Sequence, residues 1–224
     1  MPSDPTSPPL GFACRRGDNR HEVQALFYHA IMERIPRQAF ASPRGVPKGW
    51  VPVGNVAWVE GVLGRRFTPD YAPAFLQSWL RRKTWTQEHW PTTLPVFLKP
   101  ADRYKRFNGV VVGEESKLRR HGPFFCSEVV QFIDEWRYYL ADGRVLAAHW
   151  YAGDELTTPA APSLDMAWPA GWCGAVDFGR LSTGEIALIE AHHPYACGWY
   201  GRVGEGKVYA EWLLAGWRYL NALP

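Results

Sequence analysis

From Pro95 onward the chain consists of short apolar segments separated by turn residues, a pattern typical of antiparallel sheets. Asp142-Gly143 lies between the segments 135–141 and 144–150 and predicts a hairpin with a two-residue turn. Because each such pair must bury one face against another layer, the fold class is expected to be α+β, with sheets in the C-terminal part.

Helical periodicity is confined to other parts of the chain. Apolar residues recur at helical spacing from Val23 to Ile31, which predicts a helix that Asn19 caps and Pro36 ends. Residues 1–17 are rich in Pro and Ser and are expected to be a disordered tail. The other expectations are helices over 73–82 and 208–220, strands over 50–63, 96–99, 109–112 and 124–132, and loops over 37–50 and 152–172.

Composition restricts the class of protein. The chain has 224 residues, 46% of them hydrophobic, which suits one or two globular domains. A net charge of only +3 argues against a dedicated nucleic-acid surface. No apolar run approaches the roughly 20 residues of a membrane span, and the first residues do not form a secretory signal, so a cytoplasmic protein without membrane association is expected.

Two carboxylates stand inside apolar strands. Asp177 lies in Val176-Asp177-Phe178, and Glu190 lies in Ile189-Glu190-Ala191, in the two arms of a second expected hairpin. Burying a carboxylate is costly unless a cation or a hydrogen-bond donor compensates it, so the pair is interpreted as a Mg²⁺ site. Without a metal two such carboxylates should repel, and removing one charge is then expected to leave the fold intact or stabilise it. A zinc site at His192-His193 with Cys197 is the weaker interpretation, because no fourth ligand has suitable spacing.

Basic residues on and after an earlier strand point to phosphate binding. Lys99 ends the apolar strand Phe97-Leu98-Lys99, where its ammonium group can approach a phosphate. The segment 105–109, Lys-Arg-Phe-Asn-Gly, suits a loop that folds over phosphates. Glu135 and Arg137 share one face of a strand, although a surface salt bridge would also explain that pair.

Together these segments resemble the ATP-grasp enzymes, most closely a small bacterial and phage clade named for two arginines and a lysine. The resemblance covers roughly 79–200 and rests on the order of the elements around Arg82-Lys83, Lys99, Glu128 to Arg137, Asp177 and Glu190. It implies the ATP-grasp fold, in which two α+β subdomains hold ATP between antiparallel sheets. The implied organisation is a substrate-side α/β region over 18–90 and an ATP-grasp domain over 91–224.

The resemblance also implies roles for individual residues. Lys99 corresponds to the lysine on the α and β phosphates and Arg137 to a catalytic arginine facing the transferred phosphate. The ATP-binding residues would be Lys99, Lys105, Glu128, Val129, Val130, Gln131 and Glu135, and the metal ligands Asp177, Glu190 and His192. His192 departs from the family pattern, which has Asn there, and Arg82 or Lys83 would replace a further lysine of larger relatives.

The implied activity is that of an ATP-dependent carboxylate–amine ligase. ATP and Mg²⁺ would be required, a carboxylate would be activated as an acyl-phosphate, and ADP and phosphate would be released. Its partners would be small-molecule or peptide acids and amines, whose identity carries no sequence signature. The alternatives are a kinase-like phosphotransferase, a nucleotide-binding module without catalysis, and a scaffold that binds proteins through a surface rich in its 12 Trp residues.

Overall fold

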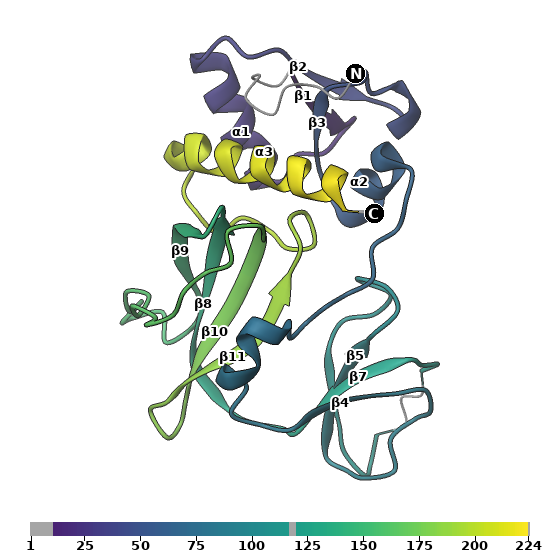
Figure 1. Ribbon diagram of the computed structural model, residues 1–224, viewed down its shortest axis with the longest axis vertical. Helices are drawn as coiled ribbons and strands as arrows, with labels where there is room; N and C mark the ends of the chain where they lie inside the picture. The colour runs from purple at the N-terminus through teal and green to yellow at the C-terminus, as the bar shows by residue number, and fades with distance from the viewer. Residues whose placement is uncertain (1–10, 117–119, 224) are drawn as a thin grey trace.

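The computed structural model describes residues 11–116 and 120–223, and its strands form three sheets (Figure 1). The N-terminal sheet is parallel, in the order β2-β1-β3, with β1 Gly11–Arg15, β2 Arg37–Phe40 and β3 Trp50–Val53. Helices α2 (Val56–Leu63) and the C-terminal α3 (Gly206–Ala222) contact β3, and α1 (His21–Met32) packs against α3. In Figure 1, α3 lies between the N-terminal sheet and the sheet that contains β8 and β9.

Several N-terminal expectations are wrong. Residues 11–15, expected in a disordered tail, form the central strand and hydrogen-bond to both neighbours, so Phe12 and Ala13 are fully buried. Residues 1–10 lie outside the described residues. Residues 37–40 are a strand rather than a loop. The segment 56–63 is a helix rather than a strand, because Asn55 caps it through the Trp58 N–H (3.0 Å) and Gly64 ends it at φ 78°.

Helix α1 is confirmed, but its capping differs from the expectation. The N-cap residue is Arg20, which makes no side-chain capping bond, and Asn19 does not cap the helix. The guanidinium group of Arg20 instead pairs with Asp18 (2.7 Å) and Glu22 (2.9 Å). These two ion pairs link the first turn of the helix to the residues before it.

The second sheet is antiparallel, in the order β11-β10-β8-β9. Its strands are β8 Phe132–Ala141, β9 Arg144–Gly153, β10 Gly174–Leu181 and β11 Ile186–His192, so both expected hairpins are confirmed. Asp142 and Gly143 have φ values of 52° and 74°, the left-handed conformation that this short turn requires. Loop residues 154–172 follow β9, as expected.

The third sheet is also antiparallel, in the order β4-β7-β5-β6, with β4 Thr84–Gln87, β5 Val96–Pro100, β6 Val110–Val112 and β7 Phe124–Ser127. The single strand expected over 124–132 is therefore wrong, because residues 128–131 connect β7 to β8 of the second sheet. Strand β4 comes before the expected domain boundary at residue 91, yet it pairs with β7, which comes after it.

Three 3₁₀ helices complete the described part of the chain: η1 Pro43–Gly45, η2 Ala74–Trp79 and η3 Val203–Glu205. The segment 73–82 is thus a 3₁₀ turn rather than the expected α-helix. None of the helices in the described residues is long and apolar enough to cross a membrane.

Side-chain alternation divides the second sheet into two faces. Trp136, Tyr138 and Phe178 pack on one face with Leu76 and Leu80 from around η2. Tyr139 and Ala175 point to the other face and join the core that includes Trp212 of α3. The charged positions 137 and 177 are two residues from 139 and 175, so they share this second face.

Candidate functional site

Three neighbouring strands of the second sheet place charged side chains on one face. Asp177 of β10 lies directly opposite Arg137 of β8 on one side and Glu190 of β11 on the other. His192 follows Glu190 by two residues and therefore projects to the same face. The pairing register thus gathers four residues that are separated by up to 55 positions along the chain.

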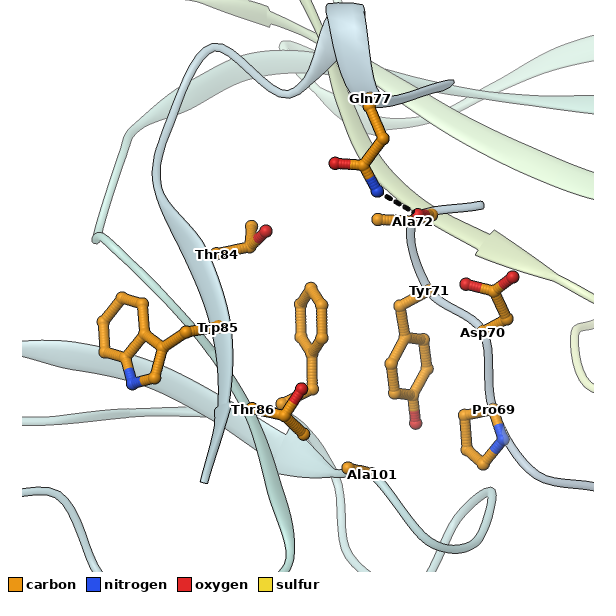
Figure 2. Close-up of a pocket in the computed structure, with 10 residues that line it drawn as sticks. Pro69, Asp70, Tyr71, Ala72, Gln77, Thr84, Trp85, Thr86 and Ala101 are labelled. Carbon is orange, nitrogen blue, oxygen red and sulfur yellow. Dashed lines mark hydrogen bonds between the residues drawn. The ribbon is translucent and has the colours of Figure 1, made fainter. Parts of the chain in front are cut away.

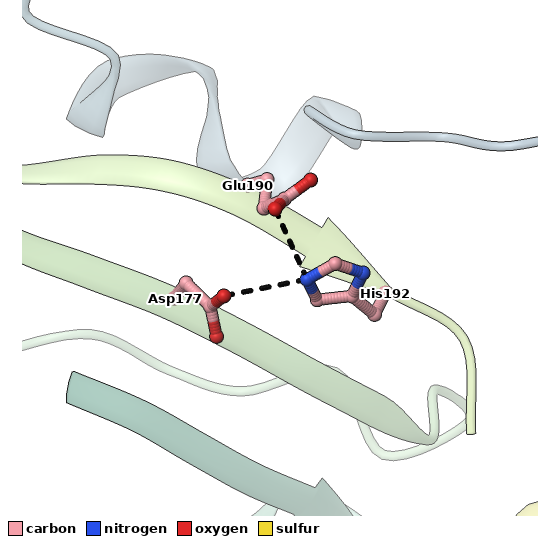
Figure 3. Close-up of side chains that lie close together, drawn as sticks. All are labelled: Asp177, Glu190 and His192. Atoms are coloured by element: carbon pink, nitrogen blue, oxygen red, sulfur yellow. Dashed lines mark hydrogen bonds and ion pairs between the residues drawn. The ribbon is translucent and has the colours of Figure 1, made fainter. Parts of the chain in front are cut away.

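Asp177, Glu190 and His192 converge closely enough to hold a metal ion (Figure 3). The Nε2 atom of His192 lies 3.3 Å from Asp177 Oδ2 and 3.4 Å from Glu190 Oε1. One ligand atom from each residue falls within 4.8 Å of the others. Neither His193 nor Cys197 belongs to this cluster, so the zinc interpretation gains no support.

Arg137 neutralises Asp177 through two parallel hydrogen bonds. Its Nε donates to Oδ1 at 2.7 Å and its Nη2 to Oδ2 at 2.6 Å, and both side chains are buried. Burial alone would raise the pKa of Asp177, but Arg137 and then His192 outweigh it and hold that pKa below its ordinary value. The carboxylate is therefore ionised and paired.

Lys99 reaches this cluster from the third sheet. Its ammonium group forms an ion pair with Glu190 and lies 3.4 Å from the centre of the Tyr71 ring. Burial lowers the pKa of Lys99, while Glu190 opposes that shift. Burial would raise the pKa of Glu190, but Lys99 and His192 hold it well below its ordinary value. Residues of two sheets thus meet at one charged centre.

Aromatic side chains surround these charges, and no local pattern in the sequence indicates them. Tyr151 and Tyr200 stack with ring centres 4.8 Å apart, and the Arg137 guanidinium lies 4.8 Å from the Tyr200 ring centre. The Tyr151 hydroxyl has one proton to donate and lies within hydrogen-bonding reach of two carboxylates, Asp177 Oδ2 at 3.3 Å and Glu135. Glu135 therefore lies beside the cluster, and burial raises its pKa.

Arg82, a candidate to replace a family lysine, lies against β11. Its guanidinium donates to the backbone oxygens of Leu188 and Ile189, the latter at 2.8 Å. These residues immediately precede Glu190. Arg82 therefore fixes the strand that carries one of the candidate metal ligands.

The remaining predicted ATP-binding residues lie outside the charged cluster. Glu128 begins the connection 128–131 between the two sheets, and its side chain accepts a hydrogen bond from the Lys83 N–H at 2.9 Å. Val129 is exposed, and the Gln131 oxygen accepts a bond from the Ser182 N–H at 3.3 Å. Lys105 lies on an exposed turn at φ 59° and lines a separate cavity.

A pocket of about 480 Å³ lies between Tyr71 on one side and Thr84 and Thr86 on the other (Figure 2). Tyr71 and Phe125 line it, with ring centres 5.3 Å apart, and both rings also flank the Lys99 ammonium group. Thr84 and Thr86 line the β4 side of the pocket. The pocket therefore combines aromatic rings and hydroxyl groups with the Asp70 carboxylate, and the Lys99 ammonium group lies beside two of the rings.

The ligand set fits a divalent cation, with one departure. Mg²⁺ prefers oxygen ligands, and the carboxylates of Asp177 and Glu190 provide them. His192 adds a nitrogen ligand, a type that suits transition metals better than Mg²⁺. Its other ring nitrogen, Nδ1, is buried and has no hydrogen-bond partner among the described residues.

Comparison with known proteins identifies the family of this chain. Residues 75–209 match the protein-family model of an ATP-grasp domain, family 2 of the clade named for two arginines and a lysine. No curated protein matches the chain.

Similar solved structures include N5-carboxyaminoimidazole synthase from Aspergillus clavatus with ADP and 5-aminoimidazole ribonucleotide (12% identity, 96% of this chain and 78% of that one, TM-score 0.46). Others are the ATP-grasp ligase PsnB with a minimal precursor (11%, 92% and 99%, 0.47) and D-alanine–D-alanine ligase from Bacillus anthracis with ATP (9%, 96% and 98%, 0.49). The family match covers most of the chain and confirms the expected fold class, so this chain belongs to the two-arginine, one-lysine clade of the ATP-grasp family.

Proposed function

We propose that the chain is an ATP-dependent carboxylate–amine ligase that activates its acid as an acyl-phosphate. The observation that supports this most is the meeting of Lys99 from one antiparallel sheet with Asp177, Glu190 and His192 from another. A lysine and a metal site facing each other are the parts needed to bind and neutralise a polyphosphate.

In this proposal the nucleotide lies between the second and third sheets. The base would occupy the pocket beside Tyr71 and Phe125 and contact the connection 128–131. Glu135 would bind the ribose hydroxyls, and Lys99 would turn from Glu190 to the phosphates. Asp177, Glu190 and His192 would hold the metal, which supplies positive charge against the phosphate oxygens when bound.

The proposed reaction has two steps. A carboxylate oxygen of the acid attacks the γ-phosphorus, the bond to the β-phosphate oxygen breaks, and ADP leaves. The amine then attacks the acyl carbon, phosphate leaves with the former carboxylate oxygen, and the amine loses a proton. Arg137 lies beside Asp177 and would stabilise the negative charge on the transferred group, so catalysis would come mainly from positioning and electrostatics.

The test is nucleotide analysis with a panel of acids and amines. ADP formation that depends on the acid is expected, and hydroxylamine should trap the activated acid as a hydroxamate. A stable phosphorylated product that hydroxylamine does not intercept would favour the kinase-like alternative. AMP formation, or no turnover with any acid despite Mg-ATP binding, would refute the proposal.

Among the described residues, the structure offers the tryptophan-surface alternative no Trp side chain that is fully exposed. Each of the 12 Trp residues lies in the described part of the chain, and each is buried or half-buried. Trp58, Trp136, Trp199 and Trp212 are within the cores. Packing in the cores therefore accounts for these four Trp residues.

A further inference from the structure

A second cavity, of about 610 Å³, lies on the N-terminal side of the charged cluster. Four parts of the chain line it: Arg20 just before α1, the start of α2, the turn 103–106 and the loop 195–198. Four basic side chains contribute to its wall, namely Arg20, Arg103, Lys105 and Arg106. The family resemblance implies a role for one of them alone, Lys105, for which ATP binding is predicted.

Two of the four basic side chains already form ion pairs. Arg20 pairs with Asp18 and Glu22, and Arg106 pairs with Asp102 at 3.0 Å. These carboxylates are not part of the cavity wall.

The other two basic side chains of the wall have no such partner in the described part of the chain. Within the described residues, Arg103 and Lys105 make no hydrogen bond or ion pair through their side chains. Glu60 is the acidic residue of the wall, and its Oε1 accepts the Phe67 N–H at 3.0 Å. The wall therefore carries two cations that form no ion pair with any described carboxylate, Glu60 included.

The loop that closes the cavity also borders the charged cluster. The Gly198 oxygen accepts a hydrogen bond from Arg137 Nη1 at 3.2 Å, and Gly198 lines the cavity. Tyr104, on the turn 103–106, packs edge-on against His193, next to His192. Cys197 lines the cavity, and burial raises the pKa of its thiol while Arg137 and Lys105 oppose that shift.

We infer that this cavity is the substrate site and that it selects molecules carrying an oxyanion, a carboxylate or phosphate held by Arg103 and Lys105. The bound oxyanion would not react. It would hold the substrate in the cavity, with the loop 195–198 between the oxyanion and Asp177. The name substrate rests on the proposed function, whereas oxyanion binding in the cavity does not.

Cys197 provides a reporter inside the cavity. The other three cysteines, Cys14, Cys126 and Cys173, are buried, whereas Cys197 is half-buried. Burial raises the pKa of Cys197 to about 11, so its thiolate is scarce near neutral pH and its modification is slow enough to time. The experiment measures modification of the full-length protein at pH 8.5 by an anionic and a cationic methanethiosulfonate, followed by mass spectrometry with peptide mapping. Each rate is divided by that reagent's rate with 2-mercaptoethanol.

The ratio of the two normalised rates cancels the thiolate fraction and reports the local potential. The anionic reagent should be favoured by about tenfold at low salt. Arg103→Gln/Lys105→Gln should remove this preference, whereas Arg37→Gln, on the far edge of the N-terminal sheet, should keep it. Circular dichroism checks that each variant is folded.

Protection identifies the oxyanion. Inorganic phosphate or succinate should slow the modification of Cys197, and neutral succinamide should not. Protection by phosphate alone indicates a phosphate-bearing substrate, and protection by succinate alone indicates a carboxylate-bearing one. The inference is overturned if the charge preference is absent, if it persists in the double variant, or if only Mg-ATP protects, which would return Lys105 to the nucleotide. No step requires turnover, so a failed ligase assay with intact anion protection refutes only the proposed activity.

Discussion

Replacing Asp177 by Asn should destabilise the protein strongly, because it leaves the Arg137 charge buried and unpaired. The two side chains are only 1% and 7% exposed, and they share hydrogen bonds of 2.6 and 2.7 Å. The new side chain keeps one acceptor oxygen, but its amide group faces a guanidinium N–H as donor against donor. Breaking one side of a buried pair costs about 3–5 kcal/mol.

That cost can be measured as a change in melting temperature. In a protein of this size 1 kcal/mol corresponds to roughly 2–4 °C, so a decrease on the order of 10 °C is expected. Scanning calorimetry without metal or nucleotide gives the value, and urea unfolding gives an independent free energy. Asp165→Asn, at an exposed carboxylate, is the matched control and should change stability by less than about 0.5 kcal/mol.

A double variant separates charge loss from simple loss of packing. Arg137→Leu with Asp177→Asn removes both charges and should recover much of the stability, since apolar replacement of a buried pair is often neutral or favourable. The reasoning would be refuted if Asp177→Asn were as stable as the wild type or more so. That result would restore the expectation of repelling carboxylates, which the ion pairs of the structure contradict.

Three further outcomes are expected. Co²⁺ should bind more tightly than Mg²⁺, and His192→Asn should reduce this difference in affinity because it removes a nitrogen ligand. Calorimetry measures the two affinities, and the visible spectrum of bound Co²⁺ reports its ligands. A spectrum that is the same in the variant would exclude His192 as a ligand. Burial lowers the pKa of His149 below 6.5, so as the pH falls the unfolded chain binds a proton at this residue before the folded protein does. The stabilisation is therefore present above about pH 6.5 and is lost as the pH falls. The change in unfolding free energy between about pH 7 and about pH 5 should be smaller in His149→Gln than in the wild type. Arg137→Ala should lower turnover far more than ATP affinity, and the reverse result would make it a nucleotide contact.

The strands and the candidate site differ in how far local sequence predicts them. The second sheet is predictable because its hairpin turns contain residues that tolerate positive φ, such as Asp142 and Gly143, and these residues can be recognised in the sequence. Pairing Asp177 with Glu190 follows from the same kind of hairpin signal. Alternation within two strands is thus sufficient to place two carboxylates on one face.

The rest depends on contacts that local sequence does not encode. Residues 11–15 resemble a tail until both neighbouring strands pair with them, and the apolar segment 56–63 has no periodicity that separates helix from strand. Tyr71 reaches the cluster from a position 119 residues before Glu190, and its backbone oxygen accepts the Ala191 N–H. Lys105 follows Lys99 by six residues, but its turn directs it to another cavity.

The charges of the site compensate one another before any ligand binds, and this has a consequence for binding. Lys99 holds Glu190, Arg137 holds Asp177, and His192 lies between the carboxylates. A metal ion alone must compete with Lys99 for Glu190, and ATP alone must draw Lys99 away and leave that carboxylate without its partner. Together they exchange partners, because the phosphates take the ammonium group while the metal takes the carboxylate.

Metal and nucleotide should therefore bind with positive cooperativity. A coupling within the usual range of about 5- to 150-fold is expected when calorimetric titrations of each ligand are compared with and without the other. The comparison is corrected for Mg-ATP formation in solution. In Lys99→Met the exchange is lost, so the metal should bind more tightly on its own and the coupling should fall towards one. Coupling that survived this substitution unchanged would show that the Lys99–Glu190 pair does not link the two ligands.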